Sequence, residues 1–182
     1  MQKSKLLSTN LIHDYKKFKM MNYHIQLPNG VEADYIMKES VEFSIIIPLI
    51  KDDTFVMVCQ HRMGADKISV EFPMGTVNGK GPEETARTEL REETGYSANS
   101  LTKVFEFYIS PGWSNQKGTL FVARDLVAGE MDLEPYEFIE VMEVKICEVE
   151  GMITRGEIFD ASTILSFYYY KSLFDPSNGS FG

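Results

Sequence analysis

The chain has 182 residues, of which 43% are hydrophobic and 25% are charged. This balance is typical of a globular protein with a sizeable core, so we expect one domain, alone or with an N-terminal extension. The net charge is −9, and no run of lysine or arginine is longer than two residues, which excludes a general nucleic-acid-binding protein.

Signals for export and for membrane insertion are missing from the sequence. The longest apolar run, residues 43–50, contains Pro48 and is far too short to span a bilayer. Residues 1–10 hold neither a secretory apolar stretch nor a small-residue cleavage site. Cys59 and Cys147 lie in no CxxC motif, so we expect two buried, reduced thiols. These features predict a cytoplasmic protein without a membrane partner.

The N-terminal residues predict a small β unit. Residues 16–27 alternate imperfectly between polar and apolar side chains and end at Pro28-Asn29-Gly30, a strong turn signal. Residues 31–38 can return as the partner strand. We therefore expect a β extension over residues 1–40, built as a hairpin or a small sheet.

The next segments predict a hairpin, a loop and a helix. Residues 43–50 and 54–60 are β-rich and are joined by Lys51-Asp52-Asp53, and residues 69–72 form a further short strand. Residues 75–81 hold three glycines, which predicts a loop. Residues 82–94 predict a helix, because Pro82 suits its first position and Gly95 suits its C-terminal cap.

The remaining segments alternate strands with few helices. Residues 101–109, 120–123 and 138–144 predict strands, with a loop that begins at Pro111-Gly112. Residues 148–155 predict a short helix, and Asp160 can cap a last helix over residues 161–174. We therefore expect an α/β protein with a mixed sheet, not a doubly wound one. Its main domain spans residues 41–175, and residues 176–182 form a flexible tail.

Glu89, Glu92 and Glu93 form the most informative cluster. On the helix their side chains project from one side, with Glu89 and Glu93 stacked most closely. Such like charges destabilise a bare helix, whereas a hard divalent cation such as Mg²⁺ takes carboxylate oxygens as ligands. The alternative is a solvated acidic face, since glutamate is common on exposed helices. The glycine loop before the helix and Gly95 after it favour a metal site.

The segment 75–96 resembles the Nudix box, G-x5-E-x7-R-E-U-x-E-E-x-G-U, in which U is a bulky apolar residue. Its second half matches Glu89-Leu90-Arg91-Glu92-Glu93-Thr94-Gly95-Tyr96, and its first glycine matches Gly75. The box arginine is replaced by Thr88. The loop is one residue short, and the first box glutamate has no counterpart among Gly79, Lys80 and Gly81. In the family, these two residues pair and brace the loop against the helix.

The resemblance extends to the ADP-ribose pyrophosphatase branch over roughly residues 15–172. It is carried by Val58-Cys59-Gln60-His61-Arg62, Glu71-Phe72-Pro73-Met74-Gly75, Ser110-Pro111-Gly112, Glu137-Phe138-Ile139-Glu140-Val141, Arg155-Gly156-Glu157-Ile158, Asp160-Ala161 and Thr163. It implies an α/β/α sandwich, and a homodimer in which the N-terminal sheets exchange. It also implies hydrolysis of a diphosphate linkage in a nucleoside diphosphate derivative, with ADP-ribose as the first candidate.

The resemblance also implies roles for individual residues. The Met74 carbonyl, Glu89 and Glu93 would hold Mg²⁺, or Mn²⁺ as the alternative ion, with Glu92 close by. Arg62 and Glu71 would bind substrate, and Glu71 could instead help to hold the metal. Glu137 would orient or deprotonate the attacking water, and Glu134 and Glu140 are competitors for this role.

Several alternatives stay open at this point. Arg62 could be a surface residue that ends an edge strand, and Glu71 could be a polar edge position. Trp113, the lone tryptophan, could stack on the substrate base or anchor local packing. Within the same reaction class, a GDP- or UDP-sugar or a dinucleotide competes with ADP-ribose. Thr88 and the shortened loop would also suit a nucleotide-binding module with weakened or lost catalysis.

Overall fold

The computed structural model describes residues 1–174 and divides into two compact units. One unit consists of Met1–Glu42 with Phe107–Lys117, and the other of Phe43–Glu106 with the chain from Gly118 onward. The tail expected over residues 176–182 lies outside the described residues. No helix among residues 1–174 is long and apolar enough to cross a membrane.

The first unit contains an antiparallel sheet. Over residues 1–42 its strands are β1 (Lys5–Asp14), β2 (Phe18–Gln26) and β3 (Glu32–Ser40), in the order β1-β2-β3. The turn between β2 and β3 contains Gly30 with a φ of 86°, a conformation that glycine adopts without strain. The expected hairpin is confirmed, and β1 extends it by one strand that the alternation pattern did not predict.

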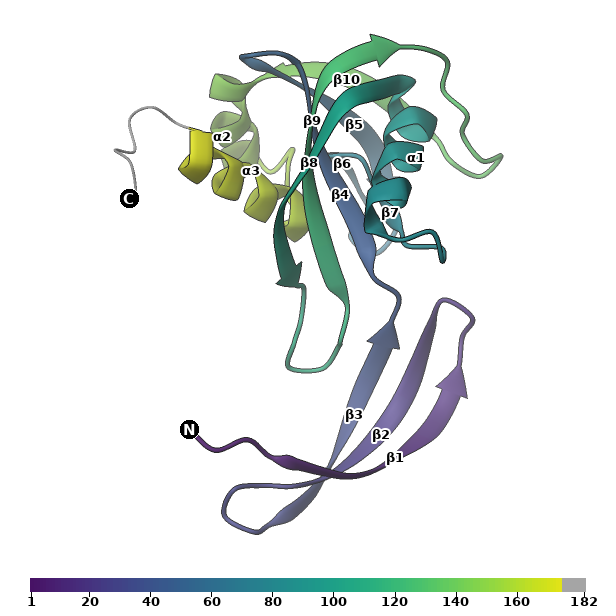
Figure 1. Cartoon of the computed structure of the whole chain (residues 1–182), viewed down its shortest axis with the longest axis vertical. Helices are drawn as coiled ribbons and strands as arrows, with labels where there is room; N and C mark the ends of the chain where they lie inside the picture. The colour runs from purple at the N-terminus through teal and green to yellow at the C-terminus, as the bar shows by residue number, and fades with distance from the viewer. Residues whose placement is uncertain (175–182) are drawn as a thin grey trace. The chain divides into compact units, whose positions relative to one another are not determined.

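The second unit contains a mixed sheet in the order β10-β5-β4-β9-β8. Its strands are β4 (Phe43–Lys51), β5 (Thr54–Arg62), β6 (Lys67–Glu71), β7 (Met74–Thr76), β8 (Tyr96–Tyr108), β9 (Lys117–Ala128) and β10 (Ile139–Lys145). β6 pairs with β5, and β7 pairs with β4. The sheet is mixed because β4 runs parallel to β9 but antiparallel to β5 (Figure 1).

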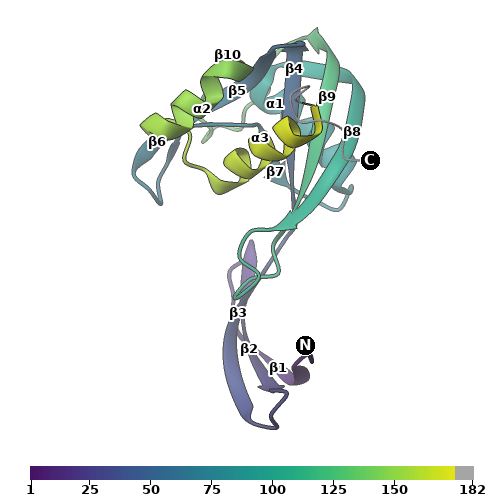
Figure 2. The ribbon, with the colours of Figure 1, turned by 90° about the vertical axis from the view of Figure 1, so that its left-hand side faces the viewer.

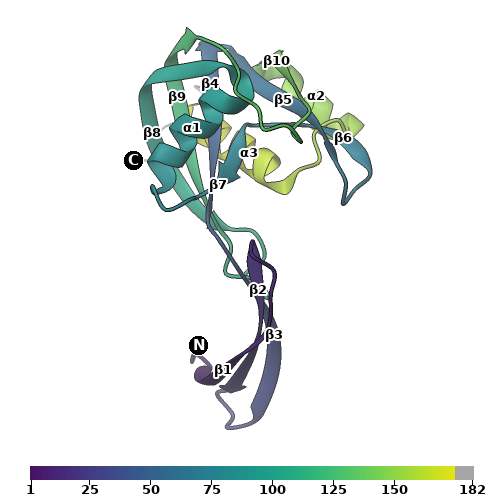
Figure 3. The same ribbon diagram turned by 90° about the vertical axis from the view of Figure 1, so that its right-hand side faces the viewer.

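Helices cover both faces of this sheet. α2 (Ile146–Arg155) and α3 (Ala161–Phe174) lie on one face (Figure 2), and α1 (Pro82–Thr94) lies on the other (Figure 3). On the α1 side, Ala86 and Leu90 pack against Ile46, Phe121 and Ala123. On the α3 side, an aromatic cluster packs edge to face, with Phe55 against Phe72, Phe167 and Tyr170. The α/β/α sandwich is therefore confirmed.

α1 begins and ends at the predicted residues. Pro82 occupies its first turn, where a missing N–H costs nothing. Gly95 ends the helix in the left-handed conformation, with a φ of 74°, and its N–H donates to the Arg91 carbonyl at 2.9 Å. The predicted caps therefore fix the helix that carries the three glutamates.

Several element boundaries differ from the prediction, and two of them lie next to α1. The segment expected to be loop from residue 75 begins instead within β7, because Met74 and Gly75 pair with Ile45 and Ser44 of β4. β8 begins at Tyr96, directly after the helix cap and earlier than the expected residue 101. In both cases the strand depends on a neighbouring strand that is distant in sequence.

The expectation of two buried thiols was wrong. Cys147 is exposed near the start of α2, where Val149 and Met152 occupy the buried positions of the helix. Cys59 is partly exposed in β5. Both cysteines are free, as expected.

Candidate active site

The predicted loop and helix bring Gly75 and Glu89 into direct proximity. A Cβ atom built on Gly75 would lie 1.9 Å from the Cδ and Oε1 atoms of Glu89. Any side chain at position 75 would therefore occupy the space of the Glu89 carboxylate. The motif glycine is explained by this close approach of β7 to α1, not by an unusual φ.

Glu93 lies one turn further along α1 and is almost fully buried, with 6% of its surface exposed. Its Oε2 accepts a hydrogen bond of 3.0 Å from the Met74 backbone N–H. This contact fixes the Met74 peptide next to the carboxylate. Glu89, Glu93 and Met74, predicted as metal ligands, are thus brought together at the junction of β7 and α1.

The two carboxyl groups are electrostatically strained. Burial, with added repulsion from Glu92, Glu137 and Glu134, raises the pKa of Glu89 to about 7. Burial and repulsion from Glu89 raise the pKa of Glu93 to about 8, although the Met74 N–H and Arg62 oppose this shift. At neutral pH the site would therefore be stabilised by protons or by a bound cation.

The donor set suits a hard divalent cation. Among residues 1–174 no three His, Cys, Asp or Glu side chains are grouped so as to hold a metal ion by themselves. The site instead offers two glutamate carboxylates with the Met74 backbone beside Glu93. Mg²⁺ commonly binds through one or two carboxylates and keeps water and substrate phosphate as its other ligands. The residues present therefore fit Mg²⁺, with Glu89 and Glu93 as the side-chain ligands.

Glu92 lies on the same helix but faces other partners. Its Oε1 accepts a hydrogen bond of 3.1 Å from Arg91, and the Arg91 side chain also reaches Asp132 at 3.3 Å. Glu92 still contributes negative charge, since it raises the pKa of Glu89. The structure thus places it near the cluster with its carboxylate paired to arginine.

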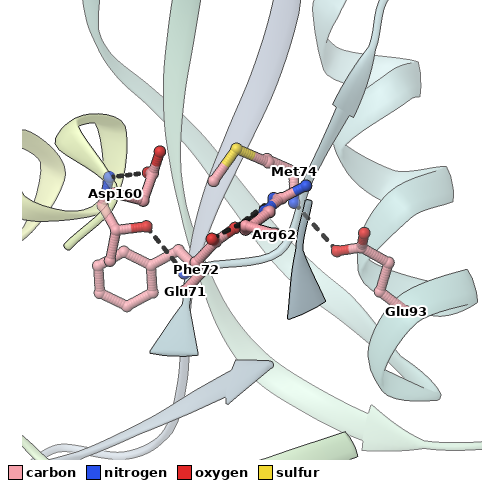
Figure 4. Close-up of polar contacts among 7 residues, drawn as sticks. Arg62, Glu71, Phe72, Met74, Glu93 and Asp160 are labelled. Atoms are coloured by element: carbon pink, nitrogen blue, oxygen red, sulfur yellow. Dashed lines mark hydrogen bonds and ion pairs between the residues drawn. The ribbon is translucent and has the colours of Figure 1, made fainter. Parts of the chain in front are cut away.

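The partly exposed Arg62 and the buried Glu71 form an ion pair, which was not predicted (Figure 4). The Arg62 Nε donates to both oxygens of Glu71 at 2.8 and 3.0 Å, and Nη2 also donates to Glu71. Glu71 is 0% exposed, so the alternative of a polar edge position is wrong. The strand register places Arg62 opposite Lys67 and Glu71 opposite Val58. The contact between Arg62 and Glu71 therefore depends on the long arginine side chain, which extends along the strand.

The loop before β10 supplies further carboxylates. Glu137 and Glu134 both raise the pKa of Glu89, and Glu137 also raises that of Glu93. The Glu137 carboxylate accepts a hydrogen bond of 3.0 Å from the Glu134 backbone N–H. Burial raises the pKa of the Cys59 thiol, and the charge of Glu140, in β10, adds to that shift. Of the three candidates for a water-orienting residue, Glu137 is thus the one whose charge raises the pKa of both Glu89 and Glu93.

Trp113 belongs to the other unit. It is about half exposed, its carbonyl accepts a hydrogen bond of 2.7 Å from the Lys38 N–H, and the Lys38 ammonium lies 6.0 Å from its ring centre. The indole is not a buried packing anchor. Its role in substrate binding stays a prediction.

A small cavity lies beside the departures from the box. It has a volume of about 90 Å³ and is lined by Thr76, Asn78, Lys80, Thr85, Thr88 and Glu89. A cavity of about 570 Å³ lies elsewhere, at the end of β5 opposite to Arg62, and its lining includes Asp53, Lys145, Glu150 and Lys171. These charges form the pairs Lys145–Asp53 and Lys171–Glu150, so the larger cavity lacks the clustered carboxylates of the candidate site.

Comparisons with known proteins agree with this geometry. Residues 41–167 match the family described as "NUDIX domain". The chain is 33% identical to the ADP-ribose pyrophosphatase of Bacillus subtilis (strain 168), over 81% of each chain. It is 31% identical to the GDP-mannose pyrophosphatase of Yersinia enterocolitica, over 92% of each chain. A solved structure titled "Crystal structure of ADP compounds hydrolase" superposes with a TM-score of 0.86 over 97% of each chain at 20% identity, which supports the fold.

Proposed function

The chain belongs to the Nudix family and is a pyrophosphohydrolase of nucleoside diphosphate derivatives, and on this premise we propose that its substrate is ADP-ribose and its cofactor Mg²⁺. The products are a nucleoside monophosphate and a sugar phosphate. The observation that carries the proposal is the carboxylate pair of the partly buried Glu89 and the buried Glu93, whose raised pKa values reflect burial and mutual repulsion that a bound cation would relieve.

Each residue of the site has a separate task in this proposal. Glu89, Glu93 and the Met74 carbonyl hold the cation, which when bound neutralises phosphate charge and aligns the diphosphate. Arg62, held from behind by the buried Glu71, directs the rest of its guanidinium toward a substrate phosphate. Glu137 orients the attacking water or accepts its proton. Glu92 adds negative charge next to the metal ligands.

The choice of ADP-ribose rests on the relative named ADP-ribose pyrophosphatase. The relative named GDP-mannose pyrophosphatase makes a GDP- or UDP-sugar the nearest alternative, and a dinucleotide is a further one. All of these substrates present the same diphosphate to Glu89, Glu93 and Arg62. Discrimination among these substrates therefore depends on residues that contact the base and the distal sugar. Trp113 is a candidate for such a residue.

A homodimer is the second part of the proposal. In the unit formed by residues 1–42 and 107–117, no helix covers the sheet, and β1 is exposed along its whole length. Leu11 and Ile12 are 56% and 53% exposed, and Tyr35 and Ile36 on β3 are also exposed. A sheet with apolar side chains on its surface needs a second layer. A second copy of the chain supplies that layer with its own N-terminal sheet, and the first chain covers the sheet of the second in the same way.

We also propose a cytoplasmic location. Cys59 and Cys147 are both free thiols, and Cys147 is exposed. Free thiols of this kind persist in the reducing cytosol.

Product analysis tests the enzymatic proposal. The purified protein is incubated with Mg²⁺ and, in turn, ADP-ribose, GDP-mannose, UDP-glucose, NADH and a diadenosine polyphosphate. We expect nucleoside monophosphate release that is fastest from ADP-ribose and is lost in Glu93→Gln. Faster release from GDP-mannose would replace ADP-ribose as the substrate. No turnover with either Mg²⁺ or Mn²⁺ would contradict the enzymatic assignment and favour a nucleotide-binding module.

A further inference from the structure

The segment 71–74 connects both halves of the candidate site. Its first residue, Glu71, holds Arg62, and the N–H of its last residue, Met74, donates to Glu93. Between them, Phe72 and Pro73 lie outside the strands β6 and β7. The relative positions of the phosphate-binding group and the metal ligands therefore depend on what fixes these two residues.

Two hydrogen bonds fix the middle of this segment, and Figure 4 shows the one that Phe72 makes with α3. The Phe72 N–H donates to the Thr163 hydroxyl at 3.3 Å, and the Pro73 carbonyl accepts from the Ile46 N–H at 3.0 Å. The first of these bonds comes from α3, on one face of the sheet, and the second from β4, within the sheet. The middle of the segment is thus held by α3 and β4, whereas its last residue, Met74, is held by Glu93 of α1.

Thr163 is itself held firmly. It is 0% exposed, and its N–H donates to Oδ2 of Asp160 at 2.7 Å, which caps the first turn of α3. The Phe72 ring is also fully buried and packs at 5.3 Å from the Phe55 ring centre. Packing of a ring restrains its position, but a hydrogen bond to the backbone also fixes the orientation of the peptide plane.

We propose that Thr163 is a positioning residue of the active site: its hydroxyl, set by the Asp160 cap, orients the Phe72 peptide and thereby aligns Glu71 and Met74 with Arg62 and Glu93. This inference rests on the proposed function, because it assigns Thr163 to the same site. Thr163 contacts neither the carboxylates nor Arg62, so it acts through the segment 71–74.

Three variants separate positioning from simple stability. Thr163→Val keeps the shape of the side chain and removes the hydroxyl, and Thr163→Ser keeps the hydroxyl. Thr119→Val is the matched control, because Thr119 is also 0% exposed and its hydroxyl has no hydrogen-bond partner in the described part of the chain. For each variant we measure the melting temperature without metal, the Mg²⁺ concentration that gives half of the maximal thermal shift, and kcat and KM for ADP-ribose.

In Thr163→Val we expect a fall in kcat/KM of about tenfold or more, since small displacements of reacting groups cost that much. We also expect the half-saturating Mg²⁺ concentration to rise, with Thr163→Ser and Thr119→Val close to the wild type. A Thr163→Val protein that melts earlier but keeps wild-type kinetics and Mg²⁺ response would overturn the inference, because Thr163 would then be only structural.

Three further outcomes bear on the inference. If Thr163→Val does not fold, Asp160→Ala loosens the cap without removing the hydroxyl, and an unchanged Mg²⁺ response in that variant refutes the inference. If the wild type turns over no substrate but is stabilised by Mg²⁺, the proposed activity fails, and the Mg²⁺ response still tests Thr163. A wild type that neither turns over substrate nor responds to Mg²⁺ or Mn²⁺ overturns both proposals.

Discussion

Replacing Glu93 by glutamine tests the electrostatic strain of the site without any assay of activity. The side chain keeps its size and can still accept the hydrogen bond from Met74, but it carries no charge. The ordinary pKa of 4.5 rises to about 8 in the folded protein. Between these two values the folded protein holds a proton that the unfolded chain has lost, so the free energy of unfolding falls as the pH rises from about 4.5 to about 8.

The size of the effect follows from the pKa shift. At about 1.4 kcal/mol for each pKa unit, the buried charge of Glu93 costs at most about 4 kcal/mol at pH 8 and about 1 kcal/mol at pH 5. Glutamine removes this cost at both pH values. For a domain of this size, 1 kcal/mol shifts the melting temperature by about 2–4 °C. The difference in melting temperature between Glu93→Gln and the wild type should therefore grow in favour of the variant by roughly 6–12 °C between pH 5 and pH 8.

Thermal melting in the presence of EDTA, at several pH values and constant ionic strength, measures this difference. Glu84→Gln is the control on the same helix, since Glu84 is exposed and is not among the charges that raise the pKa of Glu89 or Glu93, and the difference between this variant and the wild type should not grow with pH. Addition of Mg²⁺ at pH 8 should raise the melting temperature of the wild type and leave Glu93→Gln unchanged. A difference between Glu93→Gln and the wild type that is the same at pH 5 and pH 8 would refute the electrostatic reasoning.

Three further predictions concern the remaining residues of the site. Arg62→Ala leaves the fully buried Glu71 without its cation, so we expect a loss in the free energy of unfolding, measured by urea denaturation, that stays below the about 3–5 kcal/mol of a fully buried pair because Arg62 is 40% exposed, together with a raised KM; unchanged stability would show that Arg62 does not stabilise the Glu71 charge. Glu137→Gln should lower kcat by about 10²–10⁴ with little change in the Mg²⁺-induced thermal shift, whereas Glu140→Gln should keep the wild-type kcat; the reverse result would transfer the role to Glu140. Thr88→Arg alone should not raise kcat much, because its glutamate partner is also missing; a large gain in steady-state assays would contradict this account of the loop.

The elements predicted best are those whose signals are local. Pro82 and Gly95 mark the ends of α1 because each acts through its own backbone conformation, and Asp160 predicts the start of α3 for the same reason. The spacing of Glu89 and Glu93 likewise places them on one side of a helix. The carboxylate pair of the candidate site could therefore be read from the order of residues along the chain.

The sequence by itself thus determined the family, the sandwich of helices around a mixed sheet, and the helix that carries Glu89 and Glu93. Only the tertiary structure decided that Arg62 binds Glu71, that Gly75 makes room for the Glu89 carboxylate, and that Thr163 holds Phe72. Helix caps and periodicity depend on neighbours within a few residues, which the sequence lists directly. Contacts such as Thr163 to Phe72 join residues 91 positions apart, and they exist only because strand register and packing bring distant segments to the same place.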